Sequence, residues 1–451
     1  MIRRLFVANR GEIALRIIRT ARRLGMTTIL GASEMDRDSL PALAADEVAI
    51  VGPAASAESY LSVGRMVEAA RDAKADAIHP GYGFLSENAA FAQAAADAGI
   101  VFVGPALATL EAMGDKLNAR RIAAEAGLPV VPGGEAAASD EARARAGETG
   151  YPLLIKAVAG GGGRGMKRVD DEADLDRQIG LAMAEAQAAF GDPRIYVERF
   201  IAQGRHVEVQ VLGDGERAVH LGDRDCSIQR RFQKLVEEAP APGLPDDARE
   251  ALRRAAVRLA EHLHYRGAGT VEFLVDAETF DFFFLEMNAR IQVEHPVTEA
   301  ISGVDIVEQQ LIIADGQLLA LNQETITLTG HAIEVRINAE DWRHDFRPSP
   351  GTVRRAAWPA GPGIRVDSHI AAGGTVPALY DSLIGKIIVT GRSREEAVAR
   401  LAGALGTLEI EGVDTTAGLH QWIAADPRFA AGGVDTRYFE GFGAVENSDH
   451  G

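Results

Sequence analysis

The sequence predicts an α/β protein (α+β overall) of about three domains. Its 451 residues correspond to this number at roughly 150 residues per domain. Strand and helix patterns alternate up to about residue 110, and a glycine run at 160–165 separates a strand from a helix. Because 47% of the residues are hydrophobic and 25% are charged, the chain can bury a large core.

Residues 1 to about 110 are predicted to form an open parallel sheet with helices on its faces. Asn9 follows an apolar run and, with Glu12, matches an N-cap and capping box, while Gly25 ends the first helix. The predicted elements are a helix over 13–24, strands at 27–30, 76–79 and 100–103, and a helix over 86–98.

A small subdomain is predicted where a strand at 153–158 enters the glycine run, and the last 120 residues are predicted to be rich in strands. The further predicted elements are a helix over 172–189, a strand at 195–201, helices at 246–264 and 298–314, strands at 331–337, 364–370 and 383–390, and an amphipathic helix at 394–405.

The net charge argues against nucleic-acid and membrane partners. Lys and Arg number 47 and Asp and Glu number 65, which gives −18, and a field of this sign repels phosphate backbones and anionic lipids. The single cysteine, Cys226, allows no intrachain disulfide and favours a reducing compartment. No run approaches the roughly 18 apolar residues of a membrane span. We therefore expect a cytoplasmic protein.

The glycine run indicates a phosphate-binding loop. Glycines let backbone N–H groups approach an anion closely, and Lys156, Arg164 and Lys167 supply positive charge beside them. The spacing matches neither a Walker A motif nor the dinucleotide fingerprint. The alternative is a flexible surface hairpin.

The segment 282–294 is predicted to be one strand that begins buried on both faces and then alternates. Glu272 lies on a neighbouring predicted strand. The polar face holds Glu286, Asn288, Arg290, Gln292 and Glu294. Hard oxygen ligands such as these suit Mg²⁺ bound with nucleotide phosphates. A solvated face of an antiparallel strand is the alternative.

Two further segments carry polar side chains in patterns that leave their role open. The strand 205–211 places His206, Glu208 and Gln210 on one face, which suits either a half-exposed strand or a ligand contact. Residues 224–234 cluster four cations, which indicates a small anion or a solvated surface. Cys226 lies in this cluster, but no base can be named that would make it a nucleophile.

Several motifs, taken together and in order, resemble those of biotin carboxylase, the ATP-grasp subunit or domain of acetyl-CoA carboxylase and its relatives. They are ANRGEIALRI, HPGYGFLSEN, MGDK, IKAVAGGGGRGM, RDCSIQRR, QKLVEEAPAP, GAGTVEF, EMNARIQVEHPVTE, RINAED and PSPG. The resemblance implies a Rossmann-like domain over 1–112, an ATP-grasp domain over 113–318 with a lid at about 131–201, and a C-terminal domain over 330–440.

The resemblance also assigns roles to residues. For ATP it implies Lys116, Lys156, Gly162, Gly163, Met166, Glu198, Arg199, Phe200, Ile201, His206, Gln229, Glu272 and Glu286, and for two Mg²⁺ or Mn²⁺ ions it implies Glu272, Glu286 and Asn288. Lys234, Arg290, Gln292 and Val293 would orient bicarbonate. Glu294 would be the base that deprotonates it. Arg336 would stabilise carboxyphosphate and biotin anions, and Tyr82 would lie near biotin.

The implied reaction transfers a carboxyl group from bicarbonate to biotin at the expense of ATP. No Met-Lys-Met biotinylation motif occurs in the chain, so biotin is expected on a separate carrier protein that also serves a carboxyltransferase. A homodimer is expected, although Arg23 replaces an acid at the family's dimer contact. Phe232 and Arg199 also depart from the family pattern. The acyl acceptor stays open between acetyl-CoA, propionyl-CoA and another acceptor, with acetyl-CoA favoured. The alternatives are a different ATP-grasp ligase and a non-catalytic nucleotide-binding regulator.

Overall fold

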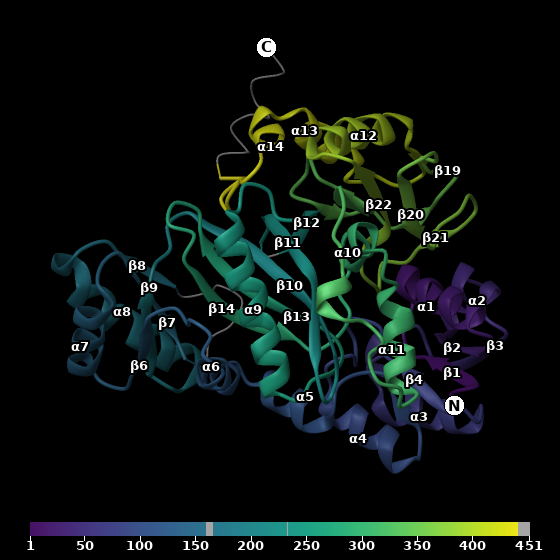
Figure 1. Ribbon diagram of the computed structural model, residues 1–451, viewed down its shortest axis with the longest axis horizontal. Helices are drawn as coiled ribbons and strands as arrows, with labels where there is room; N and C mark the ends of the chain where they lie inside the picture. The colour runs from purple at the N-terminus through teal and green to yellow at the C-terminus, as the bar shows by residue number, and fades with distance from the viewer. Residues whose placement is uncertain (159–165, 232, 441–451) are drawn as a thin grey trace.

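The computed structural model describes residues 1–158, 166–231 and 233–440. Figure 1 shows one large central sheet. The N-terminal α/β part and the C-terminal part lie at one end of it, and a small sheet with two helices stands apart at the other end. Among the helices of the described residues, none is long and apolar enough to cross a bilayer.

The N-terminal part is a five-stranded parallel sheet in the order β3-β2-β1-β4-β5. This confirms the predicted open parallel sheet. Its strands are β1 (Arg4–Val7), β2 (Thr27–Ser33), β3 (Glu47–Gly52), β4 (Ala77–His79) and β5 (Val101–Phe102). Its helices are α1 (Gly11–Arg23), α2 (Leu40–Ala44), α3 (Val63–Asp72) and α4 (Ala89–Asp97), with single 3-10 turns at Glu34–Asp36 and Ser56–Glu58.

The predicted capping box at the start of α1 is wrong. Arg10 is the N-cap residue and its side chain caps nothing. The Asn9 amide instead donates to the carbonyls of Pro80 (2.6 Å) and Tyr82 (2.8 Å). Gly81 has φ +64°, and a Cβ atom there would lie 2.8 Å from Asn9 Nδ2. Asn9 therefore holds the turn after β4 rather than the helix.

The small sheet, in the order β6-β9-β7-β8, lies within the predicted lid. Its strands are β6 (Gly133–Ala136), β7 (Leu153–Ala157), β8 (Lys167–Val169) and β9 (Ile195–Arg199), and its helices are α7 (Ser139–Thr149) and α8 (Glu172–Phe190). A separate apolar core that includes Leu153, Ile155, Leu175 and Val197 holds it together. Helices α5 (Leu107–Gly114) and α6 (Lys116–Glu125) connect it to the N-terminal part.

The central sheet has eight strands in the order β14-β13-β10-β11-β12-β15-β22-β20. The first five strands of that order are β14 (Phe282–Asn288), β13 (Arg266–Asp276), β10 (Gly204–Asp214), β11 (Ala218–Arg230) and β12 (Gln233–Ala239), followed by β15 (His331–Asn338), β22 (Leu383–Gly391) and β20 (Ile364–Ser368). The antiparallel pairing of β12 with β15 makes the sheet continuous from the ATP-grasp segment into the C-terminal segment. Side chains from both segments can therefore meet on one face.

Helices cover this sheet and complete the C-terminal part. They are α9 (Asp246–His262), α10 (His295–Ser302), α11 (Ile306–Ala314), α12 (Arg394–Thr407), α13 (Ala417–Ala425) and α14 (Pro427–Ala431), with a 3-10 turn at Gln323–Thr325. Short two-stranded ladders join β16 (Glu340–Asp341) to β17 (Arg347–Pro348), β18 (Gly351–Thr352) to β21 (Thr375–Val376), and β19 (Arg355–Ala357) to β23 (Glu409–Glu411). The predicted helix over 298–314 is in fact two helices, because Gly303 with φ +70° ends α10.

The predicted strand over 282–294 is only half correct. β14 ends at Asn288, and the alternation beyond it belongs to a loop of residues 289–294. β14 is also an edge strand, and Leu285 is 36% exposed, so its start is not buried on both faces.

A buried arginine joins the strands under the site. Arg224 and Glu208 are register partners on β11 and β10, and both side chains are 0% exposed. The guanidinium donates to Glu208 (2.6 Å), Gln210 (2.8 Å), and the hydroxyls of Thr270 and Thr298 (2.9 Å each). The cation is thus fully compensated.

We expect Arg224→Met to destabilise the fold by about 3–5 kcal/mol, because it leaves buried polar partners unpaired. Arg254→Met is the matched control, since Arg254 forms an exposed pair with Glu250 that contributes about 0–1 kcal/mol. Urea unfolding of both variants measures the effect. Equal, small shifts would show that the buried network adds little.

Candidate active site

One ammonium group contacts side chains from three other segments. Lys234, at the start of β12, donates to Glu208 of β10 (2.6 Å), to Glu272 of β13 (2.9 Å) and to Glu294 of the 289–294 loop (2.7 Å). The Gln292 side-chain oxygen accepts at 3.3 Å. The predicted metal ligand Glu272, the predicted bicarbonate contact Gln292 and the predicted base Glu294 therefore all meet at Lys234.

These charges stabilise one another against the cost of burial. Burial raises the pKa of Glu294, but Lys234 and Arg336 outweigh it, and the pKa lies below its usual value. The pKa values of Glu208 and Glu272 are lowered in the same way, against burial, mainly by Lys234. Burial alone would lower the pKa of Lys234, but the three carboxylates raise it well above normal. All four groups are charged at neutral pH.

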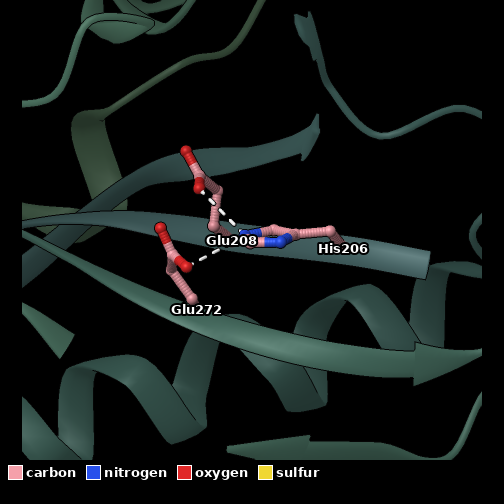
Figure 2. A group of neighbouring side chains, drawn as sticks. All are labelled: His206, Glu208 and Glu272. Carbon is pink, nitrogen blue, oxygen red and sulfur yellow. Dashed lines mark ion pairs between the residues drawn. The ribbon is translucent and has the colours of Figure 1, made fainter. Parts of the chain in front are cut away.

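His206 adds a second cation to this cluster (Figure 2). Its Nε2 lies 3.1 Å from Glu272 and 3.5 Å from Glu208. Burial would lower the pKa of His206, but Glu272 together with Glu208 raises it to about 9. The strand predicted at 205–211 is therefore not half-exposed, since it carries a buried ionic cluster on the face that holds Glu208.

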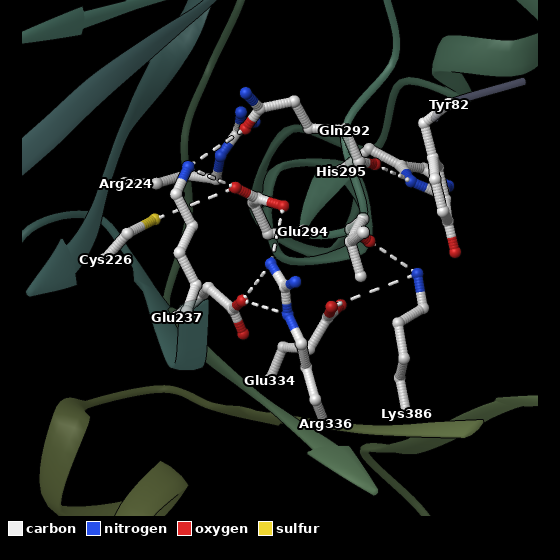
Figure 3. A network of polar contacts seen from close by, with 12 residues as sticks. Tyr82, Arg224, Cys226, Glu237, Gln292, Glu294, His295, Glu334, Arg336 and Lys386 are labelled. Carbon is white, nitrogen blue, oxygen red and sulfur yellow. Dashed lines mark hydrogen bonds and ion pairs between the residues drawn. The ribbon is translucent and has the colours of Figure 1, made fainter. Parts of the chain in front are cut away.

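Arg336 holds the other oxygen of the predicted base, as Figure 3 shows. Its guanidinium donates to Glu294 Oε2 (3.1 Å) and to Glu237 (2.6 Å). Glu294 is 2% exposed and has a cation on each carboxylate oxygen. Such a carboxylate is ionised and can accept a proton from a bound substrate.

The loop that carries Arg290 and Gln292 is fastened by groups from outside it. Glu87, which ends the HPGYGFLSE segment, accepts from the Ala289 backbone N–H (2.9 Å) and from Arg290 Nε (2.8 Å). Arg290 also donates to Asn288 (2.8 Å). The Gln292 amide donates to Glu272 (2.9 Å). Arg290 and Gln292 therefore lie close to the cluster without forming a strand.

The three predicted metal ligands lie on adjacent strands. Glu272 and Glu286 are register partners on β13 and β14, and the Asn288 amide donates to Glu272 at 2.9 Å. Glu286 is partly exposed and lies 3.6 Å from the exposed ammonium of Lys116. Two carboxylates and an amide oxygen beside an exposed lysine form a donor set that suits Mg²⁺ with a phosphate.

The predicted nucleotide contacts of the small sheet form a group of their own. Lys156 on β7 donates to Glu198 on β9 (2.8 Å), and Arg120 lies 3.6 Å from the same carboxylate. Ile201 is buried, and the Phe200 ring lies under the Arg168 guanidinium. Met166 and Arg199 of this group are exposed, whereas Gln229 is half-buried and lies on β11 of the central sheet. Gly162, Gly163 and Phe232 lie outside the described residues.

Tyr82 and Cys226 border the cluster. The Tyr82 hydroxyl donates to Glu12, which lies in the first turn of α1. The Cys226 thiol lies 4.0 Å from Glu294, and burial raises its pKa well above its usual value. A thiol that stays protonated is a poor nucleophile, which removes that alternative.

The sequence patterns missed the residues that support the site. Glu87, Glu237 and Lys386 hold Arg290, Arg336 and the Val293 carbonyl respectively. Glu87 and Glu237 lie inside motifs that resemble the family, and this position could have marked them as site residues. Strand alternation could not show which cation each one faces. Lys386 lies outside these motifs and gave no signal.

Sequence comparisons cover almost the whole chain. Residues 1–110 match the family described as biotin carboxylase, N-terminal domain, residues 115–322 match carbamoyl-phosphate synthase L chain, ATP binding domain, and residues 334–441 match biotin carboxylase C-terminal domain. Biotin carboxylase from Pseudomonas aeruginosa is 48% identical over 444 residues, which are 98% of each chain. A pyruvate carboxylase subunit from Methanothermobacter thermautotrophicus is 45% identical over 98% of this chain and 90% of its own.

Solved structures share the fold. A biotin carboxylase–β,γ-ATP complex from Campylobacter jejuni superposes with a TM-score of 0.90 at 46% identity, covering 98% of this chain and 99% of that one. The biotin carboxylase domain dimer of Hydrogenobacter thermophilus 2-oxoglutarate carboxylase, in complex with MgADP, ADP and bicarbonate, gives 0.89 at 45% identity over 99% and 98%.

These likenesses confirm the predicted three-part architecture of parallel N-terminal sheet, ATP-grasp domain and C-terminal domain. The similarity to biotin carboxylase covers all three parts at 48% identity and includes its N- and C-terminal domain families. This distinguishes the chain from other ATP-grasp ligases. The chain belongs to the biotin carboxylase family of ATP-dependent ligases.

Proposed function

We propose that this chain catalyses the first half-reaction of a biotin-dependent carboxylase, with bicarbonate as the carboxyl source and biotin on a separate carrier protein. The observation that carries the proposal is the Glu294 carboxylate, which is buried, ionised and held between Lys234 and Arg336. Cations on both sides of a base form a pocket for a small anion that must lose a proton.

In this proposal Glu294 takes the bicarbonate proton, and a bicarbonate oxygen then attacks the γ-phosphorus of ATP as the bond to ADP breaks. Lys234, Arg290, Gln292 and Val293 orient the bicarbonate. Arg336 stabilises the resulting carboxyphosphate and the biotin anion, and Tyr82 lies near the biotin ring. The C–O bond of carboxyphosphate breaks, the leaving phosphate takes the ureido N–H proton, and the carboxyl group passes to that nitrogen. Positioned cations suit the spread charge of phosphoryl transfer.

We also propose nucleotide and metal sites on the residues predicted for them. Lys116, Lys156 and the glycines at 162 and 163 would hold phosphates, and Glu198 and Ile201 would meet adenine. Glu272, Glu286 and Asn288 would hold two Mg²⁺ or Mn²⁺ ions, which when bound neutralise phosphate charge. The support is their oxygen-rich arrangement on β13 and β14 and the MgADP of the Hydrogenobacter thermophilus domain.

We also propose the domain limits at 1–112, 113–318 and 330–440 that the resemblance implies. Matches at 1–110, 115–322 and 334–441 support them.

The assembly proposed is a homodimer that works with a carrier protein and a carboxyltransferase. The concern that Arg23 would add repulsion at the dimer contact is reduced, because it pairs within the chain with Asp305 (2.8 Å) and Glu308 (2.6 Å). The dimer named for the Hydrogenobacter thermophilus domain supports the proposal. Sedimentation velocity measures it, and an active monomer would contradict it.

The proposed acyl acceptor is acetyl-CoA. Relatives named for pyruvate and 2-oxoglutarate carboxylases leave these acids as the alternatives. The carboxyltransferase that co-purifies with the chain decides among them.

The half-reaction itself predicts that the purified chain carries no covalent biotin and cleaves MgATP when bicarbonate and free biotin are added. Intact mass and ADP release measure the two properties. ATP cleavage at the same rate with and without bicarbonate and biotin would contradict the proposal, and so would a biotinylated chain.

Two matched substitutions separate the base from the metal ligands. Glu294→Gln keeps the shape of the side chain but cannot accept a proton, so turnover should fall roughly 10²–10⁴-fold while ATP affinity stays near normal. Glu286→Gln should instead weaken Mg²⁺-dependent ATP binding. Biotin-dependent turnover and ATP affinity are measured for both. If Glu294→Gln loses ATP affinity, or keeps near-normal turnover, then Glu294 is not the base.

A further inference from the structure

Lys386 is a buried lysine on the C-terminal side of the site. It lies on β22 directly opposite Arg336 of β15, and its side chain is 0% exposed. Residues opposite each other on antiparallel strands point to the same face, so Lys386 and Arg336 both face the 289–294 loop, as Figure 3 shows. Neither the proposed bicarbonate contacts nor the proposed ATP contacts include Lys386.

The Lys386 ammonium reaches across to the loop backbone. Its Nζ donates to the Val293 carbonyl at 2.5 Å, and it lies 3.3 Å from Glu12 and 3.9 Å from Glu334. A side chain of the C-terminal segment thus binds the main chain of the ATP-grasp segment and a carboxylate of the N-terminal segment.

Val293 lies between the two residues whose side chains enter the cluster. Gln292 contacts Glu272 and Lys234 through its amide, and Glu294 contacts Lys234 and Arg336. The loop has no strand ladder to satisfy its carbonyl groups, so side chains and nearby backbone N–H groups do so. The His295 backbone N–H serves the Gln292 carbonyl at 3.3 Å, and Lys386 serves the next carbonyl.

We propose that Lys386 is a positioning residue for bicarbonate deprotonation, which acts by fixing the Val293 carbonyl and thereby the directions of Gln292 and Glu294. This inference rests on the proposed function of the same site. A charge-assisted hydrogen bond to the peptide between the two side chains restrains both of them, and a displacement of about 1 Å at a reacting group can cost 10²-fold in rate.

The competing explanation is that Lys386 only balances the buried charge of Glu12. Burial would lower the pKa of Lys386, but Glu12 and Glu334 raise it, so it is a cation. Burial raises the pKa of both carboxyls, and that of Glu334 lies well above its usual value. Glu12 is the nearer of the two to the Lys386 ammonium, at 3.3 Å against 3.9 Å. Charge balance and carbonyl positioning can be separated, because they use different partners.

The deciding variants are Lys386→Met and the charge-balanced pair Lys386→Met/Glu12→Gln. Met keeps most of the length of the side chain but donates no hydrogen bond, and the amide oxygen introduced by Glu12→Gln can still accept from the Tyr82 hydroxyl. We expect both variants to lower kcat/KM for bicarbonate by about 10- to 100-fold, with KM for ATP nearly unchanged. Thermal unfolding should show that the double variant recovers stability that the single variant loses.

Glu12→Gln is the matched control, since it removes the ion pair and leaves the hydrogen bond to Val293. Its kcat/KM for bicarbonate should stay within about threefold of the unmodified chain, well short of the loss expected when the hydrogen bond is removed. The inference is overturned if the double variant regains normal bicarbonate kinetics, or if Glu12→Gln alone reproduces the loss. If the unmodified chain shows no bicarbonate-dependent ATP cleavage, the proposed function fails instead.

Discussion

The ionic contact of Lys234 with Glu208, Glu272 and Glu294 is the constraint on which the site depends. Three carboxylates within reach of one another would repel, and burying each of them unpaired would cost several kcal/mol. One ammonium, supported by Arg224, His206 and Arg336, keeps them ionised. The positions of strands β10, β12 and β13 are therefore tied to the position of the proposed base.

The site lies where all three parts of the chain meet. The continuous sheet brings Arg336 and Lys386 of the C-terminal part beside Lys234. The N-terminal part contributes Glu87, which binds the loop, and Glu12, which pairs with Lys386 rather than with the loop. Residues of both parts bind the 289–294 loop, which follows β14 and pairs with no described strand. The geometry of the site therefore depends on the assembled chain rather than on one domain.

The sequence predicted the parallel sheet, helix α8 and most of the central strands, because each has a clear period and end signals. It failed at Gly303 because apolar residues continue on both sides of the glycine that ends α10. It failed at Asn9 and beyond Asn288 for a common reason. A capping pattern or a polar residue at every second position indicates that a side chain has a polar partner. It does not show which residue that partner is. The Asn9 amide donates to a turn 71 residues away, and Glu294 is polar because its side chain meets Lys234 and Arg336.

The most direct test of the account is the pH dependence of stability in Lys234→Met, compared with the unmodified chain in nucleotide-free protein with a chelator. The folded pKa values of the three carboxyls lie below their unfolded values of about 4.3, so their stabilisation is present above about pH 5 and is lost as pH falls. Without Lys234 these pKa values rise. We predict a loss of about 3–5 kcal/mol at pH 7.5 that shrinks steadily toward pH 4.5. A loss of the same size at both pH values, or no loss at pH 7.5, would contradict the account.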